Sequence, residues 1–341
     1  MATALVYSEK YLEHSPSTGH PERPERLISI VGGLRDAGLW GPPKTRIIDP
    51  PPATLDDVLL VHTKEYVENV RKHCMSGTPL DGDTPVGKNT FELALFAAGG
   101  AISAGRAVID GTAKNSFALV RPPGHHAFRS MGGGFCYFNN IAVMIKRMQR
   151  AGVRKIAVVD YDAHHGNGTQ DIFYGDPSVL YFSLHQHPST LYPGSGFTSE
   201  IGSGEGVGYT INIPMKPGSG DAEYSSAFRE IIVPIIDQFQ PDMIAVSAGF
   251  DSHSDDPLTE LDLSSESYGW MTNLIMDVAG KSCGGRVVVV LEGGYNLKAV
   301  SESAKNVVLA LTGVKFRVPE PSDQLEVVRE LKGILARWWD V

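Results

Sequence analysis

Histidines and aspartates gather in a few short segments of this 341-residue chain. The segments RPPGHH (121–126), DYDAHHGNG (160–168) and SLHQH (183–187) together hold six of the eleven histidines. Each lies at the end of an apolar run that is typical of a buried strand, as do GFD (249–251) and EGGY (292–295). One such histidine would usually be an ordinary surface or core residue, but a series of them at successive strand ends indicates a catalytic site.

Aspartate and histidine without cysteine favour a catalytic metal site, in which zinc typically takes three protein ligands and leaves a position for water. Asp162 and His164 are two residues apart, so their side chains point to one side at the extended end of a strand. Asp251, at another strand end, could supply the third ligand. Because a bound metal lowers the pKa of water from about 15.7 to roughly 7, the site predicts hydrolysis.

Hydrolysis of an amide also needs a base, an acid for the leaving amine and a donor for the oxyanion. His125 and His126 are adjacent and can serve as the base and its electrostatic partner. Each needs an orienting group, for which Asp160 and Asn167 are available. Tyr295 follows two glycines that let the backbone approach closely, so it is the expected oxyanion donor.

The elements that must position these side chains indicate an α/β fold. Six runs rich in β-branched residues are predicted as strands: 116–120, 155–160, 178–184, 209–213, 242–248 and 286–291. Because unbroken apolar runs are buried on both faces, they indicate a parallel sheet covered by helices. Helices are expected at 89–110, 139–151, 221–239, 264–280 and 298–312, with Pro234 kinking the third. Such sheets bind ligands at the carboxyl ends of their strands, where the polar segments lie.

No internal repeat and no glycine-rich or proline-rich linker divides the chain, so residues 1–341 are predicted to form one domain. Its last part, 319–341, is expected to be a helical tail that carries Trp338 and Trp339 and docks on the body.

Composition excludes several classes of protein. The share of hydrophobic residues, 42%, against 20% charged residues, is that of a globular protein. Cys74, Cys136 and Cys283 form no C-x-x-C pair, which disfavours a zinc finger or a disulfide framework and favours a reduced, cytoplasmic location. A net charge of −9 without a basic block predicts no direct nucleic-acid binding, although it would attract a cationic substrate. No signal peptide is apparent, and no apolar stretch is expected to approach the ~18 residues of a membrane span.

The chain resembles the zinc-dependent histone deacetylase family over about residues 15–315. Six ordered motifs carry the resemblance: RPPGHHA, GGGFCYFNNIAV, VDYDAHHGNGTQDIF, SLHQH, SAGFDSHSDDP and LEGGYN. GHPERPERL (19–27) and Asn167 are similar to the class II branch and to bacterial histone deacetylase-like amidohydrolases. The resemblance implies the arginase/deacetylase fold, a single α/β domain with a central parallel sheet flanked by helices. It also implies removal of acyl groups from Nε-acyl-lysine of proteins or peptides by attack of a metal-activated water.

For the reaction, the resemblance implies that His126 is the general base and then the general acid, oriented by Asn167. It pairs His125 with Asp160 in an electrostatic role. Tyr295 would polarise the acetyl carbonyl.

For metals, the resemblance implies Asp162, His164 and Asp251 as the ligands of one zinc ion. It further implies two structural potassium sites. The first would use Asp160, Asp162, His164, Ser183 and Leu184 with backbone carbonyls, and the second Phe173, Asp176, Val179 and Tyr209.

The resemblance also implies a tunnel for the acyl-lysine side chain. Phe135 and Tyr192 would be its walls, with Gly134 between them and Leu258 at the rim. Arg26 would line an internal channel for acetate. The remaining histidines with an expected place are structural or rim residues: His20, His185, His187 and His253.

Three other functions remain open. An arginase-like enzyme would need two manganese ions, but Gly166 and His253 stand where further carboxylates should be. An acetylpolyamine amidohydrolase would have an acidic residue at the rim, where Leu258 stands, although Glu260 or Asp255 could substitute. A non-catalytic acyl-lysine binding module is disfavoured by the intact catalytic set. The expected partner is therefore an acetylated lysine peptide or protein, or an acetylated polyamine, without a membrane, and a homo-oligomer is left open.

Overall fold

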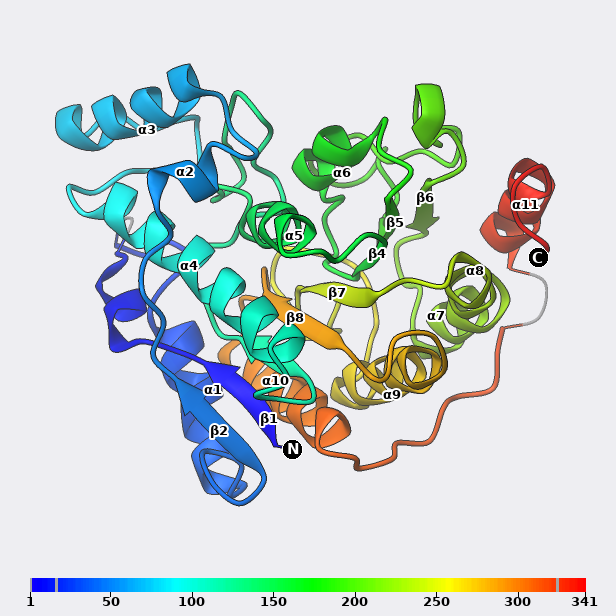
Figure 1. Ribbon diagram of the computed structural model, residues 1–341. Helices are drawn as coiled ribbons and strands as arrows, with labels where there is room; N and C mark the ends of the chain where they lie inside the picture. Colours follow the sequence, from blue (N-terminus) through cyan, green and yellow to red (C-terminus); the bar gives the residue numbers. More distant parts are fainter. Residues whose placement is uncertain (1, 16–17, 323–324) are drawn as a thin grey trace.

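Eight strands, every neighbouring pair of them parallel, form one sheet in the computed structural model, which describes residues 2–15, 18–322 and 325–341 (Figure 1). Their order across the sheet is β2-β1-β3-β8-β7-β4-β5-β6. In chain order they are β1 (Thr3–Val6), β2 (Thr45–Ile48), β3 (Ser116–Ala118), β4 (Ile156–Asp160), β5 (Val179–Gln186), β6 (Thr210–Met215), β7 (Met243–Ala248) and β8 (Val287–Leu291). The strands from β3 to β8 are buried along their whole length, so the predicted parallel sheet with two covered faces is confirmed.

Helices lie on both sides of the sheet (Figure 1). One side carries α4 (Thr90–Ile109), α5 (Asn140–Arg150) and α6 (Asn167–Phe173), and the other α1 (Glu25–Asp36), α9 (Ser265–Ser282) and α10 (Leu297–Leu311). The remaining elements are η1 (Glu9–Glu13), α2 (Leu55–Val58), α3 (Lys64–Ser76), η2 (Gly204–Gly206), α7 (Asp221–Ala227), η3 (Phe228–Ile232), α8 (Val233–Phe239) and α11 (Glu326–Leu335). Apolar side chains from the sheet and both helical layers join in one core, which is the arrangement of a single domain.

Two helix caps also position the polar segments. Asn139 begins α5 by accepting the Ala142 N–H at 3.0 Å, and its amide donates to the carbonyl of Ala127 at 3.1 Å. The cap therefore holds the turn that follows His126. Asn296 begins α10 by accepting two main-chain N–H groups, which fixes the helix start directly after Tyr295.

The strand order creates a switch point between β4 and β7. From β4 the chain builds outward through β5 and β6, and it then returns to add β7 and β8 on the other side of β4. The segments that follow β4 and β7 consequently leave the sheet in different directions, which opens a crevice at their carboxyl ends. Asp162 and His164 follow β4, and Asp251 follows β7.

The expectation that no stretch approaches a membrane span was wrong for α4. By length and composition this helix is long and apolar enough to cross a bilayer, with a mean hydropathy of 1.4 over its most apolar window. Of that window, 67% is buried, and the helix packs against β1, β3, β8 and α5. Its apolar character is that of a helix in the core of the fold.

The strands predicted from the sequence are present in the sheet, but two further strands were not predicted. Strands β1 and β2 were missed because each has only four residues and β2 is partly exposed at the sheet edge. The helix expected at 221–239 is present as α7, the π-helical turn η3 and α8, with Pro234 in the first turn of α8. Proline lacks an N–H and therefore interrupts the helical hydrogen bonds at this point.

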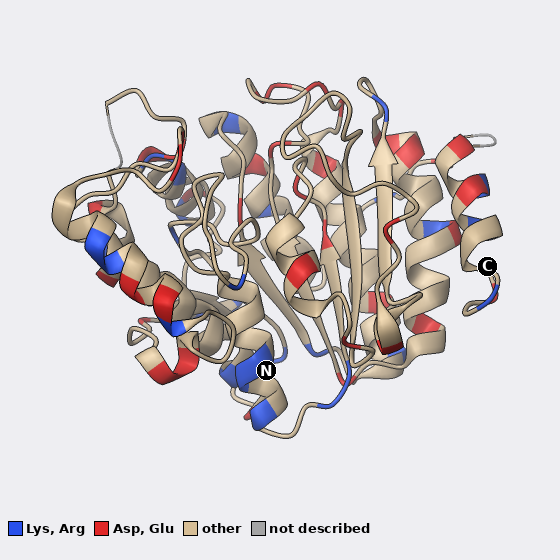
Figure 2. Ribbon diagram, turned by 90° about the horizontal axis from the view of Figure 1, so that it is seen from above, with Lys and Arg blue, Asp and Glu red and all other residues tan. Residues whose placement is uncertain are grey.

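The C-terminal tail is helical over a shorter range than 319–341, because α11 begins at Glu326 and ends at Leu335, while 323–324 lie outside the described residues. Trp338 and Trp339 follow the helix. The Trp339 indole N–H donates to the carbonyl of Gly208 at 2.8 Å. Figure 2 shows acidic and basic residues together on this last helix, and two of them pair with the body, Glu326 with Lys216 and Lys332 with Glu230.

Candidate metal centre and active site

Three side chains with metal-binding atoms meet at the switch point of the sheet. Asp162 and His164 after β4 and Asp251 after β7 bring candidate ligand atoms within 4.8 Å of one another. The Nδ1 atom of His164 lies 3.2 Å from Asp162 Oδ1 and 3.0 Å from Asp251 Oδ2. Within 2–15, 18–322 and 325–341, this is the one group of three such residues.

The surroundings of this group suit a bound cation. Asp162 and Asp251 are fully buried, and two carboxylates buried side by side are costly unless a positive charge lies between them. Burial and the charge of Asp162 raise the pKa of Asp251. Gly249 and Gly293 leave room there, since a Cβ atom at either would overlap carboxylate oxygens of this pair. Two carboxylates and one imidazole are also a donor set that zinc accepts.

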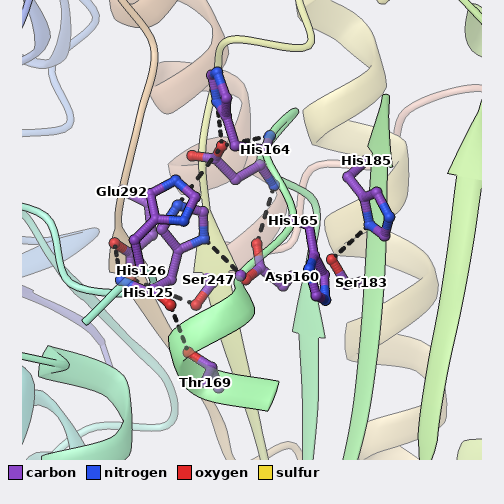
Figure 3. Close-up of polar contacts among 12 residues, drawn as sticks. His125, His126, Asp160, His164, His165, Thr169, Ser183, His185, Ser247 and Glu292 are labelled. Carbon is purple, nitrogen blue, oxygen red and sulfur yellow. Dashed lines mark hydrogen bonds and ion pairs between the residues drawn. The ribbon is translucent and has the colours of Figure 1, made fainter. Parts of the chain in front are cut away.

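His125 is held in a charged state beside this centre. Its Nδ1 atom lies 3.1 Å from Asp160 Oδ2, which also accepts the Tyr181 hydroxyl at 3.2 Å (Figure 3). Burial lowers the pKa of His125, but the charges of Asp162 and Asp160 outweigh it and raise the pKa to about 10. His125 can therefore act as a fixed positive charge.

His126 is held in the opposite state. Its Nδ1 atom lies 2.8 Å from Asn167 Oδ1, which also accepts the Gly168 N–H, so the imidazole donates from Nδ1. Nε2 then carries the free lone pair. Burial, together with the charges of His125 and His164, holds the pKa of His126 well below its usual range. The two neighbouring histidines thus have the separated pKa values that acid-base work requires.

Tyr295, the predicted oxyanion donor, packs against Phe135 and Arg26. Its ring centroid is 5.8 Å from that of Phe135, and the Arg26 guanidinium lies 5.0 Å from the ring. Arg26 is fully buried and donates from Nε to the Gly294 carbonyl at 2.6 Å. Gly294 has φ +108°, which favours glycine, and a Cβ there would lie 2.7 Å from Phe250 Cβ.

Two of the predicted tunnel residues contact side chains of the candidate site. Phe135 packs against Tyr295, while the ring centroid of Tyr192 lies 5.1 Å from His126 and 6.5 Å from His164. Gly134 passes between the walls with φ +55°, and a Cβ there would lie 2.5 Å from His126 Cδ2. Phe135 itself has φ +68°, which is uncommon outside glycine and commonly marks functional sites.

Leu258 is 37% exposed and is tied to the centre through its neighbours. Thr259 donates its hydroxyl to the carbonyl of Asp251, and the Leu258 N–H donates to Asp256. Asp255 and Glu260 are exposed in the same segment, so acidic groups exist close to this residue in the chain.

The structure also gives the positions of predicted structural or rim histidines and of the expected potassium ligands. His20 packs against Phe135 with ring centroids 4.6 Å apart, and His253 Nε2 lies 2.9 Å from Ser265 Oγ. Of the expected potassium ligands, Asp160 stands opposite Ser183 across β4 and β5. The others are Leu184 in β5, Phe173 at the end of α6, Val179 at the start of β5, Tyr209 before β6, and Asp176, whose carboxylate pairs with Lys146 at 2.8 Å.

Sequence reasoning assigned no role to Glu292, although its place in an apolar strand end was a signal. Its carboxylate is fully buried and accepts the N–H groups of Gly124 at 2.7 Å and His125 at 3.1 Å (Figure 3). Burial raises its pKa to about 7. Glu292 therefore joins the end of β8 to the turn that carries the two catalytic histidine candidates.

A buried histidine pair, His165 and His185, was also missed as a support of the tunnel wall. Their ring centroids lie 4.8 Å apart (Figure 3). His185 Nε2 donates to the Gly196 carbonyl at 2.9 Å, and His165 Nδ1 lies 2.9 Å from Ser195 Oγ. Both contacts fix the loop 188–200, which carries Tyr192. No spacing in the sequence indicates this contact.

Comparisons with known proteins show the family and the fold of this chain. The histone deacetylase domain matches residues 20–311. A probable deacetylase of Archaeoglobus fulgidus is 45% identical over 95% of this chain and 90% of its own length. A histone deacetylase-like amidohydrolase of Pseudomonas aeruginosa is 39% identical over 91% of this chain and 82% of its own. The crystal structure of the HDA15 HD domain superposes with a TM-score of 0.93 at 39% identity, covering 99% of this chain and 95% of that one.

Proposed function

This chain belongs to the histone deacetylase family, and from that premise we propose that it is a zinc-dependent hydrolase of acetyl-lysine in peptides or proteins. The products are free lysine and acetate. The observation that carries the proposal is the meeting of His164 and the buried Asp162 and Asp251 with His126, whose pKa is held well below its usual range. Family membership supports a deacetylase or amidohydrolase reaction, and the metal and the substrate are our inference.

Asp162, His164 and Asp251 would hold the zinc ion. When bound, zinc would act as a Lewis acid toward the amide carbonyl and would acidify a water molecule. His126 donates from Nδ1 to Asn167, so its Nε2 can take a proton from the attacking water and return it to the lysine amine as the C–N bond breaks.

The neighbouring groups set the electrostatics of the reaction. His125, charged through its contact with Asp160, has its ring 4.1 Å from that of His126 and opposes a second positive charge there. The Tyr295 hydroxyl would donate to the oxyanion. Phe135 and Tyr192 would enclose the apolar stem of the acyl-lysine, for which aromatic walls are suitable.

We also propose two structural potassium ions, in the places given above for Asp160 and Ser183 and for Phe173 and Asp176. In the second place Lys146 Nζ pairs with the Asp176 carboxylate at 2.8 Å. The proposal of these ions rests on the family resemblance.

The test compares turnover of an acetyl-lysine peptide and of acetylspermidine by the zinc-loaded protein, with Tyr295→Phe as the variant. We expect the peptide to be preferred and the variant to lose about 10²–10³ in kcat, as for the loss of one oxyanion donor. Absence of turnover of both substrates would contradict the deacetylase proposal. A tenfold preference for acetylspermidine would select the polyamine alternative.

A further inference from the structure

Asp256 joins two segments of the site that are far apart in sequence. It lies between β7 and α9 and is 6% exposed. Its Oδ2 atom accepts the Tyr295 N–H at 2.7 Å and the Asn296 N–H at 3.3 Å, while Oδ1 accepts the Leu258 N–H at 3.0 Å. Both carboxylate oxygens are therefore used, one toward Tyr295 and one toward the tunnel rim.

The backbone around Tyr295 needs such an anchor. Gly293 and Gly294 precede it, and glycine leaves the backbone free to take several conformations. Arg26 fixes the Gly294 carbonyl from one side, and Asp256 fixes the next N–H from the other. Asn296, which follows, donates its side-chain amide to the carbonyl of Asp255 at 3.0 Å. The segment 255–258 thus clamps the turn 294–296.

We propose that Asp256 is a positioning residue, which fixes the Tyr295 hydroxyl relative to the metal centre. The inference rests on the proposed role of Tyr295 as oxyanion donor. Hydrogen bonds to a carboxylate are about twice as strong as those between neutral groups. An oxyanion donor is effective only when it is held in place beforehand, and a shift of about 1 Å can cost roughly 100-fold in rate.

The first experiment compares Asp256→Asn with Asp262→Asn. Asparagine keeps the size of the side chain but turns an NH₂ group toward one of the N–H donors, so one anchor is lost. Asp262 is exposed in the same loop between β7 and α9, so its substitution makes the same chemical change outside the segment 255–258. We expect Asp256→Asn to lose about 10–100-fold in kcat on the acetyl-lysine peptide, with Asp262→Asn within about twofold of wild type. Equal activities of the two variants would overturn the inference.

The second experiment separates positioning from general stability. A trifluoromethyl ketone analogue of the acetyl-lysine peptide would accept a hydrogen bond from Tyr295, and its Kd is measured for Asp256→Asn, Tyr295→Phe and the double variant. If Asp256 acts through Tyr295, the double variant binds no more weakly than Tyr295→Phe alone. Fully additive losses would show that Asp256 acts elsewhere and would refute the positioning role.

A replacement variant and the behaviour of the wild type complete the experiment. Asp256→Glu retains the charge but moves the carboxylate by one methylene, so it gives the same comparison should Asp256→Asn not fold. A wild-type protein that neither hydrolyses the peptide nor binds the ketone refutes the proposed function itself. An active wild type whose Asp256 variants behave like Asp262→Asn refutes the role of Asp256 alone.

Discussion

Substitution of Gly196 by alanine should displace the tunnel wall without touching the metal ligands. Gly196 has φ +95°, and a Cβ atom there would lie 2.5 Å from His185 Nε2 and 2.7 Å from His165 Cγ. Both rings are buried and cannot move outward. Gly194, two residues earlier in the same loop, has φ +80°, but its Cβ would have nothing nearer than the Pro188 carbonyl at 3.9 Å.

Alanine has the same backbone cost at Gly194 and Gly196, but only at Gly196 does it also overlap other side chains. An alanine in the left-handed region costs about 1–2 kcal/mol at either position. At Gly196 the overlap with the histidine rings adds about 1–3 kcal/mol, and loss of the bond from His185 to the Gly196 carbonyl leaves a buried polar group unpaired. We therefore expect Gly196→Ala to be less stable than Gly194→Ala by about 2–6 kcal/mol.

Urea unfolding measures the difference in stability, and steady-state kinetics on the acetyl-lysine peptide measure its consequence. Because Tyr192 lies in the displaced loop, we expect Gly196→Ala to raise KM several-fold more than Gly194→Ala, with an unchanged zinc content by elemental analysis. Equal losses of stability and equal KM values in the two variants would show that the histidine pair does not fix the loop.

Three further outcomes are expected. Burial lowers the pKa of His62 to about 4 in the folded chain. As the pH falls, the unfolded chain therefore binds a proton at this histidine before the folded chain does. The contribution of His62 to the free energy of unfolding should be constant above pH 6.5 and should fall by up to ~3 kcal/mol between pH 6.5 and 4. In urea unfolding of His62→Gln, the free energy of unfolding should decline less than that of the wild type over this pH range, by the same amount. An identical pH dependence of the two proteins would contradict the prediction. Trp339→Phe loses an indole bond to a main-chain carbonyl and should cost about 1–2 kcal/mol more in urea unfolding than Trp338→Phe, which keeps it; equal losses would argue against this docking. Removal of the proposed zinc by a chelator should lower Tm, since Asp162 and Asp251 would lose their shared cation, and Asp251→Asn should abolish the shift measured by calorimetry.

The catalytic segments could be found from the sequence because their positions are local properties. Apolar β-branched runs mark buried strands, and the carboxyl ends of parallel strands share one edge of a sheet. Asp162, His164 and Asp251 could therefore be placed together before any coordinates were known. Strands β1 and β2 could not be found in this way, because runs of four residues carry too weak a pattern.

The sequence by itself determined the fold class, the family and the residues that gather at the carboxyl ends of the strands. Only the tertiary structure decided the protonation state of each residue and the neighbours that hold it in place. His125 and His126 are chemically identical neighbours, and they differ because one faces Asp160 and the other Asn167 in a buried space. The supporting carboxylates Glu292 and Asp256 act through bonds to distant main-chain N–H groups. Such bonds depend on how strands and loops meet in space, and this is not encoded in local spacing.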